Sequence, residues 1–200
     1  MDFPWYEEIT EENSIHISQG DIINCKVPFI IETKQAPYFN ALQADIKGIV
    51  MTQACDLEND RVKVNEFTIC PIVTLEEVLK DKMIKQFGND PGFKYDSMTA
   101  KQRQQKYNYA EKIRQGNILD YYLLNNYESD TTPVLNQSFQ VVTLRFVYRV
   151  PIGSLKNQVR DNPIKRLRLL PPYREHLSHA FSFNFSRIGL PTDILIPKDI

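Results

Sequence analysis

Apolar and polar residues alternate near the start of the chain with the period of two that is typical of strands. Ile15 and Ile17 alternate with polar neighbours, Gly20 lies in a predicted turn, and a second apolar run covers residues 22–31. Pro28 interrupts this second run, and proline lacks the N–H group that a central strand would donate. We therefore expect two strands around a sharp bend, the second one bulged or at a sheet edge near Pro28.

Two further extended segments follow in the first third of the chain. A loop is predicted over residues 32–45, then a buried strand over 48–54, where an apolar run stops abruptly at Thr52. Residues 62–73 have the composition of another strand. Strands this close in sequence favour antiparallel pairing in a small sheet or barrel.

A helical period begins at Thr74. Thr74 and Glu77 have the spacing of a capping box, and apolar residues then recur every three or four positions. Ser97 or Thr99 can cap a second, more polar helix. We expect residues 74–117 to form a helical insertion between strands.

Strand character returns after the insertion. It is predicted over residues 118–124, most strongly over 139–150, and again over 167–170. Arg145 and Arg149 lie four positions apart, so in one continuous strand they would project from the same face. A strand face that carries two arginines is exposed to solvent, paired with acidic residues or functional.

The last predicted helix covers residues 172–188, after a short turn over 154–158. Its apolar stripe is Tyr173, Leu177, Ala180, Phe181, Phe185 and Ile188, with Gly189 and Pro191 as a stop signal. The expected fold is α+β in a single domain over residues 1–200. It consists of a small antiparallel β-barrel (14–73 and 118–170), the insertion and the C-terminal helix.

Composition is that of an ordinary globular domain, with 42% hydrophobic and 24% charged residues. The first residues are acidic and have neither a basic leader nor a continuous apolar segment, so we expect no secretory signal. No later apolar run approaches the roughly 20 residues of a membrane span. We expect a soluble, cytoplasmic protein with no membrane partner.

Charge is distributed unevenly along the chain. Residues 1–66 hold twelve acids and five bases, a net charge of −7, whereas residues 142–187 hold nine bases and two acids, a net charge of +7. The basic segment could contact phosphates. Alternatively, the two halves neutralise one another within the fold, or the bases are solvated. The binding candidates in the basic segment are Arg145, Arg149, Arg166 and Arg168.

Cysteine and histidine usage predicts neither a disulfide framework nor a metal site. The three cysteines form no C-x-x-C pair, which favours reduced thiols. His176 and His179 could place two ligands on one helical face, but no third ligand can be named. We expect no metal and no cofactor.

Cys55 and Asp56 follow directly after the predicted buried strand, where side chains can reach a pocket rim. A thiolate nucleophile needs a neighbouring cation or base, and an adjacent acid has the opposite effect. The alternative is a small buried thiol beside a turn-forming or capping aspartate. Thr52 and Gln53 could orient a ligand, or they could satisfy backbone groups at the strand end.

The last helix carries a second set of candidates. Arg174, His176 and His179 lie largely away from the apolar stripe, and histidine beside arginine suits acid/base chemistry on a phosphodiester. The alternative is an ordinary surface position for both histidines. Phe181, Phe183 and Phe185 are interpreted as core packing in preference to a stacking ladder for bases.

Four segments in the first 75 residues resemble the MazF/PemK-type endoribonuclease toxins. They are the Gln19-Gly-Asp-Ile-Ile23 opening, a variable loop, Gly48-Ile-Val-Met-Thr52 and Phe67-Thr-Ile-Cys-Pro-Ile-Val-Thr74. The resemblance implies that the small barrel is SH3-like, of the MazF/PemK type. The toxins' catalytic arginine falls on Ile46, with Lys47 one place away, and their catalytic threonine falls near Val73 or Thr74. The chain thus departs from the toxin pattern at the chemistry.

Two motifs, T-Q-x-C-D-L over 52–57 and P-Y-R-E-H-L over 172–177, with Arg187-Ile-Gly-Leu-Pro191, resemble a family of uncharacterised bacterial proteins that pairs them. That resemblance implies a bacterial context and no particular activity.

The resulting functional hypothesis is a MazF-like interaction module of a bacterial toxin or anti-phage defence system. It would bind and restrain a protein partner, such as a regulator or a defence effector, without catalysis. The alternative is a metal-independent endoribonuclease that binds RNA. In that case Lys47, Thr74, Arg174 and His176 are the candidates for phosphate stabilisation and proton transfer.

Overall fold

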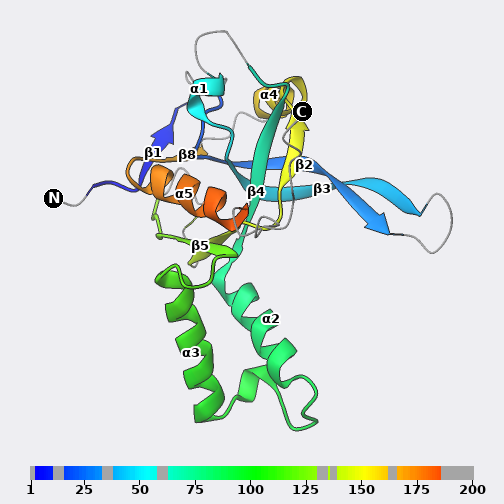
Figure 1. Ribbon diagram of the computed structural model, residues 1–200, viewed down its shortest axis with the longest axis vertical. Coiled ribbons are helices and arrows are strands. Elements are labelled where there is room, and N and C mark those ends of the chain that lie inside the picture. Colours follow the sequence, from blue (N-terminus) through cyan, green and yellow to red (C-terminus); the bar gives the residue numbers. More distant parts are fainter. Residues whose placement is uncertain are drawn as a thin grey trace, which may run out of the picture.

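The computed structural model describes residues 3–10, 16–32, 38–57, 63–129, 135, 139–161 and 166–185. Within these ranges the chain forms an 8-stranded antiparallel sheet with helices around it and on a projecting arm (Figure 1). The predicted α+β class is therefore confirmed. None of the described helices has both the length and the apolar character that a membrane crossing requires.

The strands follow the order β1-β8-β2-β3-β4-β6-β5, and β7 pairs with β4 beside this path. Their bounds are β1 Tyr6–Ile9, β2 Asp21–Glu32, β3 Phe39–Val50, β4 Glu66–Thr74, β5 Tyr121–Leu124, β6 Gln140–Thr143, β7 Tyr148–Pro151 and β8 Arg166–Leu169. The helices are α1 Ala54–Leu57, α2 Leu75–Phe87, α3 Ala100–Arg114, α4 Ile152–Asp161 and α5 Tyr173–Phe185, with a 3-10 turn at Tyr95–Ser97.

The described strands do not close into a barrel. β1 and β5 stand at the two ends of the hydrogen-bonded order. The sheet nevertheless curls, because β7 contacts β2 although the register pairs β7 with β4 only. The closed barrel expected from the sequence is thus replaced by a curled, open sheet.

A long hairpin of β2 and β3 projects from this sheet as an arm (Figure 1). Its register runs from Ile22 opposite Ile49 to Glu32 opposite Phe39. The loop predicted over 32–45 is wrong for most of that range, since β3 begins at Phe39. Local patterning is weak there, and cross-strand pairing with β2 fixes the extended conformation.

Two predictions near the C-terminal half are also wrong. The strand predicted over 139–150 is split into β6, which pairs with β5 and β4, and β7, which pairs with an earlier part of β4. Arg145 lies in the intervening turn, so it does not share a strand face with Arg149. The turn predicted over 154–158 lies inside α4, where Leu155 and Val159 are buried.

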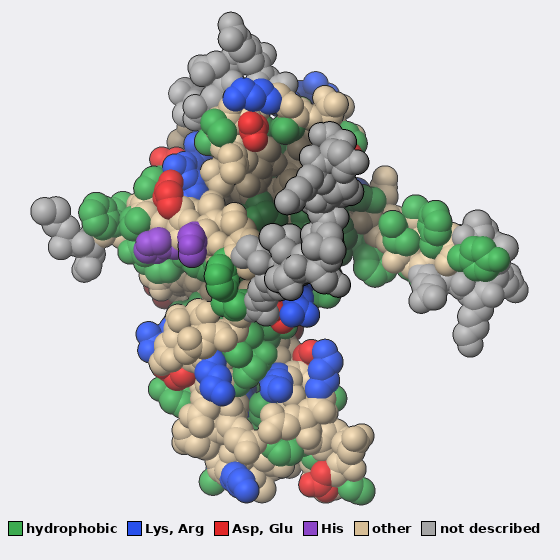
Figure 2. Space-filling model, in the orientation of Figure 1, with side chains coloured by type: hydrophobic (Ala, Val, Ile, Leu, Met, Phe, Trp, Pro, Cys, Tyr) green, Lys and Arg blue, Asp and Glu red, His purple; other side chains and the backbone are tan. Residues whose placement is uncertain are grey.

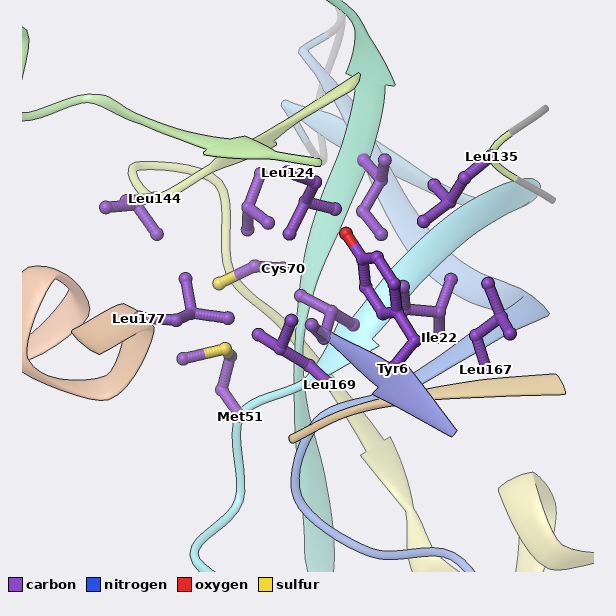
Figure 3. Close-up of a cluster of buried hydrophobic side chains, with 13 residues drawn as sticks. Tyr6, Ile22, Met51, Cys70, Leu124, Leu135, Leu144, Leu167, Leu169 and Leu177 are labelled. Carbon is purple, nitrogen blue, oxygen red and sulfur yellow. The ribbon is translucent and has the colours of Figure 1, made fainter. Parts of the chain in front are cut away.

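Two apolar cores lie on opposite faces of the sheet. Ile22 and Ile49 belong to the first core. Leu177 of α5 joins this core beside Met51 and Cys70 (Figure 3). The alternate residues Ile23 and Val50 point into the second core, which Leu155 of α4 covers. This alternation is what the period of two in the sequence dictates.

The predicted stripe of the last helix is confirmed in part. Tyr173, Leu177, Ala180 and Phe181 pack on the first core. Phe185, however, is half exposed, as is Phe183, so core packing is wrong for these two rings. Ile188, Gly189 and Pro191 lie outside the described residues.

The helical insertion forms a second arm, made of α2 and α3 (Figure 1). The capping box predicted at Thr74 with Glu77 is present, and of the two predicted caps of the second helix Thr99 is the N-cap, in a capping box with Gln102. Each box satisfies backbone N–H groups that the first helical turn leaves free. A small apolar cluster containing Val78, Ile113 and Val141 anchors the arm to the sheet.

Acids of the first half of the chain pair with bases of the second half. Asp21 is fully buried and lies 2.9 Å from Arg166, and its other oxygen binds Arg168. Glu7 also pairs with Arg168, and Glu66 pairs with Arg149. The interpretation that the two halves neutralise one another within the fold is confirmed for these pairs.

Candidate functional site

Lys47 and Thr74, the candidates nearest the toxin positions, meet on one face of the sheet beside the helical arm. Lys47 Nζ donates to Gln140 Oε1 at 3.2 Å. Gln140 is the register partner of Thr74, and directly opposed residues of antiparallel strands share a face. Lys47, Gln140 and Thr74 therefore form a polar cluster at the rim of the first core.

Burial and neighbouring charges act in opposite directions on the pKa values of this cluster. Burial lowers the pKa of Lys47, and the carboxylate of Glu77 raises it in part. The pKa of Glu77 is lowered by its hydrogen bonds to Thr74, with a smaller effect of Lys47. Beside Lys47 lies an open groove of about 400 Å³ that Asn24, Asp45 and Gln158 also line. A half-buried ammonium at such a groove can bind an anion.

The hydroxyl of Thr74 is already committed to the helix cap. Its O–H donates to Glu77 Oε2 at 2.8 Å, and its oxygen accepts from the Glu77 N–H at 3.1 Å. The second of these bonds, together with the Thr74 N–H that donates to Glu77 Oε2 at 2.8 Å, makes the capping box that the sequence predicted. Thr74 is therefore engaged in starting α2, and a catalytic role would require it to leave the cap.

Thr52 lies just after the end of β3, and its side chain accepts a hydrogen bond from the backbone of β4. It is buried, and its Oγ1 accepts from the Thr68 N–H of β4 at 2.7 Å. Gln53 is exposed next to it. Of the two sequence interpretations for Thr52, the structural one agrees with this contact.

Cys55 lies exposed on the one-turn helix α1, so the interpretation as a buried thiol is wrong. Its Sγ is 3.5 Å from Gln53 Oε1 and 4.0 Å from Asp56 Oδ1. Both partners are acceptors, and neither is the cation that would stabilise a thiolate. The other two cysteines are buried, and burial raises the pKa of Cys25 and of Cys70 to about 12.

The candidates on α5 face away from the core. Arg174 donates to Glu175 Oε1 at 2.7 Å. His176 is exposed with its ring edge-on to Tyr173, and His179 is exposed with its ring stacked on Phe183. These contacts leave both histidines open to solvent. Figure 2 shows histidine side chains on the molecular surface.

Gln19 and Ser178, and not the candidate residues on α1 and α5, link these two helices. Gln19 Oε1 accepts from the Ala54 N–H at 3.4 Å, and Gln19 Nε2 donates to Ser178 Oγ at 2.8 Å. Sequence reasoning missed Gln19 and Ser178, since an amide in a turn and a serine on a helix are common. The contacts of Gln19 thus link the elements that carry Cys55, Arg174 and His176.

The four binding arginines of the basic segment all have carboxylate partners. Arg145 pairs with Asp120 and Arg149 with Glu66, each at 2.7 Å on the surface. Arg166 and Arg168 both bind Asp21. Burial lowers the pKa of Arg168, but the hydrogen bond and charge of Asp21 outweigh it and raise the pKa overall. Asp21 therefore fastens β8 to the start of β2.

The β2–β3 arm presents a second candidate surface, of a different chemical character. Beyond the point where β4 leaves β3, large apolar side chains are exposed on both faces of the ribbon: Phe29, Ile30, Ile31, Tyr38, Phe39 and Leu42. A groove of about 840 Å³ lies where the arm meets α4 and β7. Its walls are mostly apolar and include Val27, Leu42, Val150 and Pro151. This surface was not predicted from the sequence, because most of β3 was expected to be a loop.

Over the described ranges, no three histidine, cysteine, aspartate or glutamate side chains are grouped as a metal site would require. In comparisons with known proteins, no family profile, no curated protein and no solved structure matches the chain.

Proposed function

We propose that this chain is a MazF-like interaction module of a bacterial toxin or anti-phage defence system. It binds a protein partner through the β2–β3 arm and restrains that partner without catalysis. The proposal includes an SH3-like ancestry for the curled part of the sheet, which the β2–β7 contact supports. A cytoplasmic location belongs to the same proposal.

The observation that carries the proposal is the apolar arm. Six large apolar side chains are exposed on one projecting two-stranded element. Figure 2 shows hydrophobic side chains gathered on this arm, beside the compact body. Soluble proteins seldom expose contiguous apolar surface of this kind unless it meets another molecule. Apolar and aromatic anchors are also the residues that dominate protein–protein binding energy.

The arrangement of the candidate catalytic residues supports a binding role. Thr74 is engaged in the helix cap, and Arg174 is paired with Glu175. The side-chain contacts of Arg174 and His176 involve Glu175 and Tyr173, on α5 itself. General acid–base catalysis needs its groups within hydrogen-bonding reach of one reacting centre. The residues near Lys47 and those on α5 form two separate sets.

Site-specific photo-crosslinking tests the proposal. A benzophenone side chain is placed at Tyr38, which is 72% exposed on the arm, or at Phe146, which is 64% exposed away from it. The chain is irradiated in bacterial cells. One protein partner is expected to crosslink at position 38, and the yield should fall when Phe29→Ser and Leu42→Ser are added. Equal crosslinking from both positions, or crosslinks to RNA only, would contradict a protein-binding arm.

Lys47 favours a second candidate function, the metal-independent endoribonuclease. A half-buried lysine that lines a groove can donate to a phosphate oxygen. Purified protein is incubated with RNA in the presence of a chelator. The nuclease hypothesis predicts cleavage that Lys47→Gln abolishes and that the surface change Lys101→Gln leaves intact. Absence of cleavage by the unmodified chain rejects it.

A further inference from the structure

The two edges of the β2–β3 arm are protected differently. On the outer edge of β2, the side-chain amide of Gln158 from α4 bonds the backbone of Lys26. Its Oε1 accepts from the N–H at 2.7 Å, and its Nε2 donates to the carbonyl at 3.4 Å. Two residues further out, Pro28 has no N–H to offer. An incoming strand could not pair with β2 at these positions.

Backbone groups of β3 point outward at alternate residues. The Gly20 N–H donates to the Val50 carbonyl on the β2 side, whereas the Met51 N–H donates to Thr68 of β4 on the opposite side. The same alternation directs the backbone of Asp45, Gln43 and Ala41 away from β2. β4 pairs with β3 only along Gly48–Val50, so among the described strands none accompanies β3 further out.

Within the part of the chain that the structure describes, nothing protects this outer edge of β3. Residues 39–44 are phenylalanine, asparagine, alanine, leucine, glutamine and alanine, with neither a charge nor a proline. Natural sheets usually guard an exposed edge with a lysine, a proline, a bulge or a covering element. Gln158 and Pro28 thus block strand pairing on the β2 edge, whereas no described residue blocks it on the β3 edge over the same stretch. The open edge is therefore available for a further strand.

The arm also lacks the packing that an isolated ribbon needs. Two-stranded hairpins are marginally stable in water, and three or more strands with an apolar face are required for independent stability. Opposed pairs expose apolar groups on each face, Phe29 with Leu42 on one and Ile30 with Ala41 on the other. Additional strands at the β3 edge would supply neighbours for both faces.

We propose that the β3 edge pairs antiparallel with the β3 edge of a second copy of this chain, giving a four-stranded sheet β2-β3-β3-β2. The charge pattern along β3 is compatible with this occupant. With Ala41 opposite Gln43 of the second copy, Asp45 lies opposite Phe39 of that copy, so no like charges oppose one another. A two-fold axis then satisfies both open edges at once. Such a dimer goes beyond the proposed function, because it joins the apolar arms of two copies into one four-stranded sheet.

Sedimentation velocity and light scattering on the full chain test this inference. The expected mass is twice the chain mass of 23.4 kDa. Two variants should be monomeric: Ala41→Pro, which removes an outward N–H without breaking a bond to β2, and Ala41→Lys with Gln43→Lys, which sets lysines opposite one another. The control Ile30→Lys adds one lysine on β2, the guarded strand, and should remain dimeric. Circular dichroism checks that each variant is folded.

Two results would overturn the inference. One is a monomeric unmodified chain at every concentration reached, which would leave the edge to a strand of another protein. The other is a dimer that persists in the double lysine variant. Neither result depends on crosslinking of a different protein at position 38, so this inference and the proposed function can fail separately.

Discussion

Asp21 illustrates how single residues hold distant parts of this chain together. Its carboxylate is fully buried and serves two arginines of β8, one of them only 4% exposed. No local sequence signal reveals this, because Asp21 stands in a turn motif and its partners are about 145 residues away. The charge distribution along the chain indicated mutual neutralisation of the acidic and basic halves as one alternative. It did not identify the residues that pair.

Asp21→Asn is expected to destabilise the fold strongly, because it leaves two arginines without their shared carboxylate. Removing one partner of a buried ion pair costs about 3–5 kcal/mol. The exposed pair of Arg174 with Glu175 provides the control, and Glu175→Gln should change stability by less than about 1 kcal/mol. Urea unfolding followed by circular dichroism measures both. Equal effects of the two substitutions would show that the Asp21 cluster is not a structural fastening.

The three thiols should differ sharply in reactivity. Cys55 is exposed, whereas Cys25 and Cys70 are buried with a pKa raised to about 12, so their thiols stay protonated at neutral pH. An aromatic disulfide reagent at neutral pH is expected to modify one thiol per folded chain and three after unfolding. Cys55→Ser should abolish the rapid reaction. Rapid modification of two or more thiols in the folded chain would be inconsistent with the described burial.

At the scale of elements, local signals predicted the helical arm and failed for the β arm. Thr74 and Thr99 cap their helices as expected, and Gly20 has the positive φ of 89° that its turn requires. Such caps and turns depend on neighbouring residues alone. The outer part of β3 and the break after β6 depend on pairing with other strands, which a single sequence does not display.

The cap at Thr74 predicts a pH dependence. Hydrogen bonds from Thr74 hold the pKa of Glu77 below its ordinary range in the folded chain. A lowered folded pKa means that this contribution is complete above the unfolded pKa and is lost as the pH falls through the folded pKa. Glu77→Gln should therefore weaken the fold near neutral pH by up to about 1 kcal/mol and lose this acid-dependent part. Unfolding midpoints across acidic pH test it, and an unchanged profile would contradict it.

At the scale of the whole molecule, two arms project from one curled sheet, and they differ in chemistry (Figures 1 and 2). The helical arm is polar and capped, and its acids and bases pair locally, as Lys106 does with Glu76 and Lys85 with Asp81. The β arm is apolar and has one open edge. The apolar surface of the β arm supports the proposal that this chain binds another protein. The polar cluster at Lys47 supports the alternative proposal, a metal-independent endoribonuclease.

Binding of the crosslinked partner, once purified, to three forms of the chain tests this account most directly. Calorimetric titration compares the unmodified chain, the arm variant with Phe29→Ser and Leu42→Ser, and Lys47→Gln. The account predicts that the arm variant loses at least about tenfold in affinity, because apolar anchors are removed, while Lys47→Gln binds as the unmodified chain does. Full affinity in the arm variant, with binding lost in Lys47→Gln, would contradict it.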